Sequence, residues 1–266
     1  ENLYGCLYGL LRFMHSWPDS TPKIRIFNPE IQSHGWESKY TVVAILCRGI
    51  PFCTASVRGE LNRRNLTIHS IASSNLVIRR NQARELEALL SDQEGAGSDV
   101  PEEAVLYFEI GRHSNPDELE ELRHTLLEIL QEVALVVDDF PAMGKQLQEV
   151  VNQLRASECV DPELREEAAA FIEWLRDAHM TMLGYEYLGV QDAGPGGHVL
   201  ELAGSNLAAV AHGVFVAKGA LLDEGEDFHG AVRVHPEALA GCDRVVVDDA
   251  EGAVAHVLRI VVVPEG

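Results

Sequence analysis

The residues with the clearest potential for chemistry form a short turn, Arg48-Gly49-Ile50-Pro51-Phe52. An apolar run at 41–47 precedes this turn, and a predicted helix at 52–64 follows it. The first N–H groups of a helix can bind a carboxylate, Gly49 lets the backbone approach a ligand, and Arg48 adds positive charge. We therefore take these five residues as the candidate ligand-binding site. The structural alternative is that a glycine in a tight turn and an exposed arginine need no ligand.

The histidines and cysteines lack the spacing of a metal or catalytic site. The 11 histidines form no HExxH pattern, and His229 and His235 are isolated in a predicted loop. No CxxC pair occurs among the five cysteines, which are Cys6, Cys47, Cys53, Cys159 and Cys242. Zinc sites need such short ligand spacings, and disulfide frameworks use an even number of cysteines. The sequence predicts free thiols, no metal and no catalytic residues.

Charge is distributed unevenly along the 266 residues, whose net charge is −21. Residues 1–90 hold 11 Lys+Arg and 7 Asp+Glu, a balance of +4, which leaves −25 for residues 91–266. Such an acidic body repels nucleic acid. No apolar run approaches the roughly 20 residues that span a membrane. We expect a cytoplasmic globular protein, and the start at Glu1 rather than Met indicates either a cut fragment or a processed chain.

The elements that must position the turn follow from the hydrophobic periodicity of residues 1–110. Leu3, Leu7, Leu10, Leu11 and Met14 fall on one predicted helical face. Strands are predicted where β-branched residues run continuously or alternate with polar ones, and residues 82–99 read as a surface loop. The predicted elements are a helix at 3–17, strands at 23–27 and 41–47, a helix at 52–64, and strands at 66–80 and 105–110.

The clearest helix begins after Asn115, which can cap it, with Pro116 in its first position. Its apolar stripe recurs every three or four residues: Leu119, Leu122, Leu126, Ile129, Leu130 and Val133. Residues 133–137 either continue this helix or form a closing strand. We expect this stripe and the sheet edges to contact other domains or subunits.

The second half reads as helices followed by a β-rich region. Helices are predicted at 141–156 and, capped by Asp161, at 162–175. Strands are predicted at 180–190, 199–202, 214–216, 245–247 and 257–263, with a helical turn at 236–240. The implied domains are a lead-in helix at 1–22, a first domain at 23–140, a helical spacer at 141–176 and a small α+β domain at 177–266.

The βαββαβ order expected within 41–140 is that of a ferredoxin-like sheet, and with Gly49 in its first turn it resembles an ACT domain. Several sequence blocks are similar, in order, to the amino-terminal region of the large class of NAD-specific glutamate dehydrogenases. These blocks are KIRIFNPE (23–30), HGWESKYTVV (34–43), PFCTASVRGELNRRNLTIHSI (51–71), FEIGRHSNPDELEELRHTL (108–126) and FIEWLRDAHMTMLGYEYLGV (171–190). The resemblance covers residues 4–190.

This resemblance implies a homo-oligomeric cytoplasmic enzyme that oxidatively deaminates L-glutamate to 2-oxoglutarate with NAD, in which ACT- and PAS-type regulatory segments precede a distant catalytic core. It gives the fold class as α+β: an ACT-type domain, a helical spacer and a second, ACT- or PAS-like domain. Where amino-acid-sensing ACT domains often have an acidic or amide residue, this chain has Cys47-Arg48-Gly49.

Catalysis by these residues is not expected. The 22 glycines never form the GxGxxG turn that binds a dinucleotide, and the lysines, Lys23, Lys39, Lys145 and Lys218, lie outside glycine-rich segments. We therefore predict an allosteric, regulatory or oligomerisation region without its own cofactor. Its expected partners are other domains and subunits of the same enzyme, with a possible small amino-acid effector. The alternatives are a stand-alone amino-acid-sensing module and a structural subunit-contact arm without ligand.

Overall fold

The computed structural model describes residues 2–91, 99–157, 161–179, 182, 184, 186–192, 198–202, 243–247 and 254–260. The chain divides into two units, Glu1–Val137 and Asp138–Gly266. Both combine helices with antiparallel strands, so the predicted α+β class is confirmed. Among the described residues, no helix has the length and apolarity to cross a membrane. The predicted domain limits at 22, 140 and 176 stay predictions.

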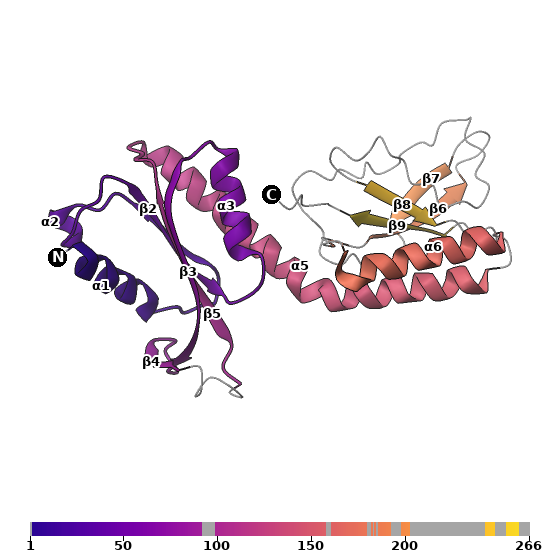
Figure 1. Ribbon diagram of the computed structural model, residues 1–266, viewed down its shortest axis with the longest axis horizontal. Coiled ribbons are helices and arrows are strands. Elements are labelled where there is room, and N and C mark those ends of the chain that lie inside the picture. The colour runs from indigo at the N-terminus through magenta and orange to yellow at the C-terminus, as the bar shows by residue number, and fades with distance from the viewer. Residues whose placement is uncertain are drawn as a thin grey trace. The chain divides into compact units, whose positions relative to one another are not determined.

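The first unit is built on a five-stranded antiparallel sheet in the order β1-β2-β5-β3-β4 (Figure 1). Its strands are β1 (Lys23–Phe27), β2 (Thr41–Arg48), β3 (Ile68–Arg80), β4 (Leu86–Leu90) and β5 (Glu102–Ile110). Its helices are α1 (Asn2–His15), α2 (Ile31–His34), α3 (Cys53–Arg63) and the first part of α5 (Pro116–Ala156). The predicted elements before residue 80 are thus confirmed within a few residues at their ends.

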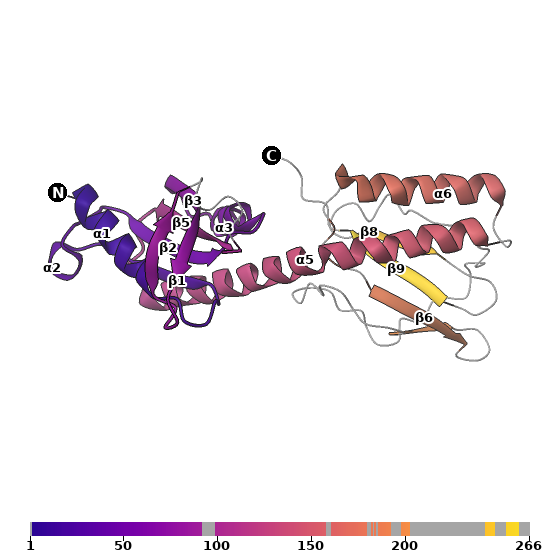
Figure 2. The ribbon, with the colours of Figure 1, turned by 90° about the horizontal axis from the view of Figure 1, so that it is seen from below.

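Strand β2 explains why both faces of the sheet are covered. Side chains alternate along a strand, so Val43 and Ile45 point to one face while Val42 and Leu46 point to the other. All of these side chains are fully buried. On the first face they pack with α3 and α5, and on the second with α1 (Figures 1 and 2). A strand buried on both faces needs the continuous apolar run that residues 41–47 provide.

The sheet differs from the predicted βαββαβ order at its edge. The closing strand that residues 133–137 could have formed is absent, because these residues continue α5. The edge position beside β2 is filled instead by β1, which pairs with β2 antiparallel, Ile24 opposite Ile45. The arrangement is consistent with an ACT-like domain in which the edge strand comes from before the βαββα core.

Two further predictions in this part of the chain were wrong. The segment 82–99 is not entirely loop, since β4 pairs with β3 after a turn in which Arg84 has φ of 61°. The predicted start of a new helix at 141 does not exist either, since α5 passes through Pro141 without interruption (Figure 2). Proline has no N–H to donate to the carbonyl of Val137. The limit between the two units falls directly after that residue.

The second unit contains the remainder of α5, α6 (Pro162–Trp174), the π-helical η1 (Leu175–His179) and a four-stranded antiparallel sheet in the order β7-β6-β9-β8. Its strands are β6 (Glu186–Asp192), β7 (His198–Leu202), β8 (Asp243–Val247) and β9 (Val254–Ile260). The side chain of Asp161 caps α6, as predicted, by accepting from the N–H groups of Glu163 and Leu164. Arg155 of α5 pairs with Glu166 and Glu173 of α6, at 2.8 Å each.

The strand predictions for the second unit are confirmed in part. Strands occur near 199–202, 245–247 and 257–263, and β6 takes up the end of the predicted strand 180–190. The predicted strand at 214–216 and the helical turn at 236–240 lie outside the described residues.

Candidate functional site

The predicted ligand turn at residues 48–52 connects β2 to α3. Gly49 donates its N–H to the carbonyl of Glu102 in β5 at 2.8 Å, and a Cβ atom on Gly49 would lie 2.6 Å from the Cβ of Glu102. Glycine is therefore required here by the neighbouring strand, whether or not a ligand binds.

The other residues of the turn lie close together and near solvent. Ile50 donates its N–H to the carbonyl of Arg48 at 2.9 Å, which tightens the turn. Phe52 takes the cap position of α3 with φ of 71° and gives the helix no side-chain cap. Arg48, Pro51 and Phe52 are exposed. The structure thus places the five predicted residues together at the amino end of α3.

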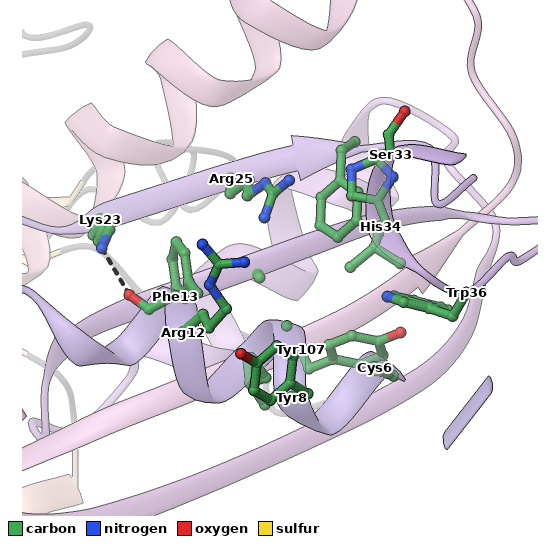
Figure 3. A pocket seen from close by; sticks show the side chains of 15 residues that line it. Cys6, Tyr8, Arg12, Phe13, Lys23, Arg25, Ser33, His34, Trp36 and Tyr107 are labelled. Carbon is green, nitrogen blue, oxygen red and sulfur yellow. Dashed lines mark hydrogen bonds between the residues drawn. The ribbon is translucent and has the colours of Figure 1, made fainter. Parts of the chain in front are cut away.

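A separate cavity of about 460 Å³ lies on the opposite face of the sheet, under α1 (Figure 3). It was not predicted from the sequence. Its walls come from α1, β1, the segment around α2, β2 and β5. This volume is in the usual range for small-molecule sites.

Positive side chains surround this cavity. Arg12 comes from α1, and Lys23 and Arg25 come from β1 (Figure 3). The described residues that line it include no Asp or Glu. Arg12 lies over the ring of Tyr8 at 6.0 Å, and Arg25 lies over the ring of Phe27 at 4.3 Å. Within the described part of the chain, neither guanidinium forms an ion pair.

Aromatic and apolar side chains form the rest of the cavity lining. Phe27 stacks on His34 with centroids 4.7 Å apart and meets Trp36 edge-on at 6.3 Å. His34 accepts a hydrogen bond at Nδ1 from the N–H of Glu30, which leaves Nε2 to carry the proton of the neutral ring. Val42 and Ala44 of β2 line the cavity as well. The lining therefore combines cationic donors with an apolar surface.

Tyr107 of β5 adds a phenol group to this cavity lining. Its O–H donates to the carboxylate of Glu109 at 3.2 Å. Burial, a hydrogen bond with the Cys6 thiol and the nearby charge of Glu109 raise the pKa of Tyr107, so the phenol stays protonated at neutral pH.

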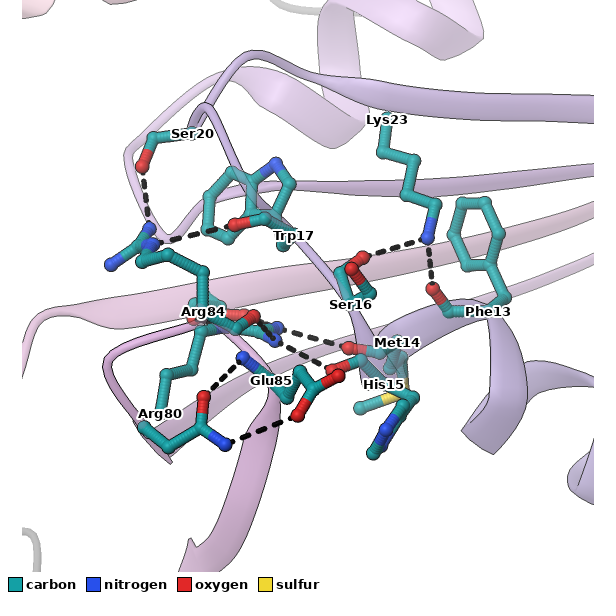
Figure 4. A network of polar contacts seen from close by, with 12 residues as sticks. Phe13, Met14, His15, Ser16, Trp17, Ser20, Lys23, Arg80, Arg84 and Glu85 are labelled. Carbon is teal, nitrogen blue, oxygen red and sulfur yellow. Dashed lines mark hydrogen bonds and ion pairs between the residues drawn. The ribbon is translucent and has the colours of Figure 1, made fainter.

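The carboxyl end of α1 is fixed to the sheet by two cations (Figure 4). Lys23 donates to the carbonyls of Phe13 and Ser16, at 2.7 and 2.8 Å. Arg80 donates to those of Met14 and His15, at 3.1 and 3.2 Å. These carbonyls have no partner within the helix, and positive charge is favourable at this end of the helix dipole.

Arg80 also forms a buried ion pair with Glu103, with the closest approach at 2.6 Å. The two side chains are only 3% and 6% exposed. The neighbouring Arg84 donates to the carbonyl of Trp17 at 3.3 Å, and both guanidinium groups lie over the Trp17 ring, at 5.6 and 5.7 Å. This polar cluster, together with the Lys23 contacts, determines where α1 lies on the sheet and therefore shapes the cavity.

The predicted apolar face of α1 was wrong in part. Leu10 is half-buried and Met14 is buried against the sheet. Phe13 is buried there too, and Cys6 is half-buried. Five other side chains are exposed and form a stripe along the helix, of which Tyr8 also borders the cavity: Leu3 (73% exposed), Tyr4 (76%), Leu7 (56%), Tyr8 (53%) and Leu11 (47%). The helix carries apolar residues around most of its circumference, so spacing alone did not identify the buried side.

The stripe predicted to contact other subunits also has a different role. Leu122, Leu126 and Leu130 are buried in the core of the first unit, against β2, β5 and α3. These leucines are therefore unavailable to a partner. No group of three or more His, Cys, Asp or Glu residues able to hold a metal ion occurs in the described part of the chain.

The antiparallel sheet, the two helices on one face and the βαββα core form a ferredoxin-like α+β domain, an arrangement consistent with an ACT-like domain. Comparison with known proteins is more specific. Residues 1–126 match the model of the family described as "Glutamate dehydrogenase, ACT1 domain", and this part of the chain belongs to that family.

Two curated relatives agree with this assignment. The NAD-specific glutamate dehydrogenase of Halomonas elongata is 38% identical over 196 residues, which are 72% of this chain and 12% of that protein. The NAD-specific glutamate dehydrogenase of Pseudomonas aeruginosa is 36% identical over 201 residues, 75% of this chain and 12% of that protein. The chain thus spans about an eighth of the length of the relatives it matches. The resemblance noted in the sequence is confirmed.

Proposed function

We propose that the chain is a non-catalytic regulatory region of a large NAD-dependent glutamate dehydrogenase. The observation that carries this proposal is the match of residues 1–126 to the glutamate dehydrogenase ACT1 domain, together with two similar enzymes of that name. The parent enzyme would convert L-glutamate to 2-oxoglutarate with NAD in the cytoplasm, and its catalytic core would lie elsewhere in the polypeptide.

The sequence supports the non-catalytic part of this proposal, because its glycines never form a dinucleotide-binding GxGxxG turn. A regulatory region acts instead through a coupling free energy: a ligand or subunit contact favours one conformation of the whole enzyme.

The length of the native polypeptide tests the proposal directly. In the Halomonas elongata relative, 196 residues are 12% of the protein, which makes it about 1,600 residues long. An antibody raised against residues 2–91 should detect a polypeptide of similar length in extracts of the source cells. The immunoprecipitate should reduce NAD when L-glutamate is added, and the purified 266-residue chain should not. Detection of a 266-residue native protein, or turnover by the purified chain, would contradict the proposal.

For the effector, the turn at residues 48–52 is one proposed position. The first N–H groups of α3 and the Arg48 side chain would bind the carboxylate of a small amino acid. A melting screen with the common amino acids tests this, because a ligand that binds only the folded chain raises its melting temperature. The shift should be reduced in Arg48→Gln and retained in Arg112→Gln, an exposed arginine whose guanidinium donates to the carbonyl of Ser38. Equal shifts in both variants would rule out the turn.

The exposed stripe of α1 favours a second candidate function, a subunit-contact arm. Its five apolar side chains form a surface of the kind that marks protein–protein contacts. Sedimentation should then show self-association of the chain that is lost in Leu7→Glu and kept in Leu135→Glu, a control of similar exposure on α5 (56% and 53%). If the wild-type chain is monomeric at all concentrations, contact between two copies of this chain is excluded. The stripe could then contact only another domain of the enzyme.

A further inference from the structure

We propose that the cavity under α1 binds a small organic dicarboxylate that has no ammonium group. Arg12 and Arg25 would each bind one carboxylate, and the hydrocarbon part would lie against the aromatic and apolar lining. This inference depends on the geometry of the first unit and not on the proposed role in glutamate dehydrogenase.

Two arginines are placed to bind the carboxylates of a ligand. Arg12 and Arg25 project from α1 and β1 toward the same cavity (Figure 3). Each guanidinium lies over an aromatic ring, at 6.0 Å for Arg12 and 4.3 Å for Arg25, and has no carboxylate partner within the described residues. A guanidinium held over a ring keeps its edge N–H groups available, and those groups match the two oxygens of a carboxylate.

Lys23 contributes charge without being a direct ligand. Its ammonium already donates to the carbonyls of Phe13 and Ser16. Burial and the neighbouring Arg80 lower the pKa of Lys23, as expected for a cation among other cations. The positive potential that these groups create favours an anionic ligand.

The lining of the cavity favours a ligand without an ammonium group over an amino acid. An α-ammonium group beside Arg12 and Arg25 would be repelled by their positive charges unless a carboxylate lay next to it. No Asp or Glu is among the described residues that line the cavity. The carboxylate of Glu109 accepts the Tyr107 O–H and is not part of the lining. Dicarboxylates, including 2-oxo dicarboxylates, therefore fit better than aspartate or glutamate.

The polar and apolar positions also fit a small dicarboxylate. Nε2 of His34 provides a further donor for an oxygen atom, while the accessible parts of Tyr8, Leu10 and Phe27 offer apolar surface to a short hydrocarbon chain. The cavity of about 460 Å³ accommodates such a molecule together with water.

Titration calorimetry and thermal melting of the 266-residue chain test this inference with succinate as the probe. Aspartate has nearly the same size but adds an ammonium group, succinamide removes the charges, and inorganic phosphate is an anion without a hydrocarbon part. Succinate should bind and raise the melting temperature, while the other three should bind at least roughly tenfold more weakly. Aspartate adds an ammonium group next to two arginines, succinamide loses the charge-assisted hydrogen bonds, and phosphate lacks a second anionic group for the second arginine.

The variants Arg12→Gln and Arg25→Gln should each weaken succinate binding roughly tenfold or more, and the double variant further. Arg58→Gln is the matched control, since Arg58 is an exposed arginine on α3, which covers the other face of the sheet. The control should bind succinate like the wild type. All three positions are exposed, so the variants should fold normally.

Several results would overturn the inference. These are no succinate binding by the wild-type chain, equal binding of succinate by Arg25→Gln and Arg58→Gln, or binding of aspartate or phosphate that is as tight as that of succinate and is weakened by Arg25→Gln. None of these results bears on the length or activity of the native enzyme, so this inference and the proposed function fail separately.

Discussion

The two faces of the sheet in the first unit are built differently. The face under α3 and α5 is a continuous apolar core, in which Val57, Leu61, Leu126 and Phe108 are fully buried. The face under α1 has a smaller apolar cluster, a buried ion pair and a cavity lined with arginines. Both faces contribute to the stability of the fold, but only the second combines a positioned helix with space for a ligand.

The two faces also differ in how easily they can change conformation when a ligand binds. Close packing resists a change of volume, so the α3 and α5 face has few alternative arrangements. Helix α1 contacts one face only and is held at its carboxyl end by Lys23 and Arg80. A ligand under the remainder of α1 could shift that helix without disrupting the core. The following changes test the distinction, from the largest expected effect to the smallest.

Arg80→Met should have the largest effect. It leaves Glu103 buried without a cation and removes the donors to the carbonyls of Met14 and His15. Breaking a buried pair in this way destabilises by about 3–5 kcal/mol. Urea unfolding followed by tryptophan fluorescence, in a Trp174→Phe background, would report on Trp17 and Trp36, both of the α1 face.

Arg79→Met is the control for this change. Arg79 meets Glu87 at 3.8 Å, and both side chains are more than half exposed. Exposed pairs contribute at most about 1 kcal/mol. Equal losses in the two variants would show that the cluster around Arg80 does not hold α1.

Leu126→Ala should destabilise the chain by about 2–5 kcal/mol, since it leaves a void in a close-packed core. Leu126 is fully buried on the face opposite the cavity. Its free energy of unfolding in urea should therefore fall, while the affinity for succinate in the folded protein stays within about twofold of the wild type. A parallel loss of affinity would mean that the two faces are not independent.

Gly5→Ala should destabilise α1 by about 1–3 kcal/mol, the usual effect of overpacking. A Cβ atom on Gly5 would lie 2.7 Å from the Cβ of Trp36, which is buried between the helix and the sheet. Gly59 in α3 provides the opposite control, because nothing lies within 4 Å of its Cβ position. There, alanine should stabilise the helix by about 0.5–1 kcal/mol. The melting temperatures should move in opposite directions, and a shared direction would contradict the packing described for α1.

The smallest effect concerns pH and Glu60 of α3. Hydrogen bonds from Arg63 and then Arg64 lower the pKa of Glu60 below its ordinary value of 4.5. Its contribution to stability is therefore complete above pH 4.5 and is lost as the pH falls through the lower pKa of the folded state. Glu60→Gln should flatten the loss of unfolding free energy in that acid range. If the plots of unfolding free energy against pH stay parallel for the wild type and Glu60→Gln in that range, this role of Glu60 is excluded. Glu87→Gln, at an exposed position, is the control.

Periodicity predicted the helices and strands of the first face, although the stripe of α5 was expected to contact other domains or subunits, while the cavity on the second face was not predicted. Leu122, Leu126 and Leu130 recur at helical spacing, and periodicity of this kind reports directly on burial. Arg12 and Arg25 are far apart in the sequence and become neighbours only when α1 packs beside β1. The alternation Lys-Ile-Arg-Ile in β1 was visible, but nothing local indicated that a helix would lie across it.

Local signals did not determine where α5 ends. Proline usually begins or breaks a helix, so Pro141 suggested a new element, and residues 133–137 were compatible with either a continued helix or a closing strand. The helix continues because both of its parts bury an apolar stripe, through Leu130 before the proline and Met143 after it. Packing of side chains along the whole length outweighed the loss of one backbone hydrogen bond.

Amide hydrogen exchange with and without succinate tests the contrast between the two faces most directly. Ligand binding should slow exchange in α1, β1 and residues 31–36, while the amides of α3 and of residues 116–137 in α5 stay unchanged. Protection centred on α3 and α5, or spread evenly over the first unit, would contradict the view that the α1 face alone responds to a ligand.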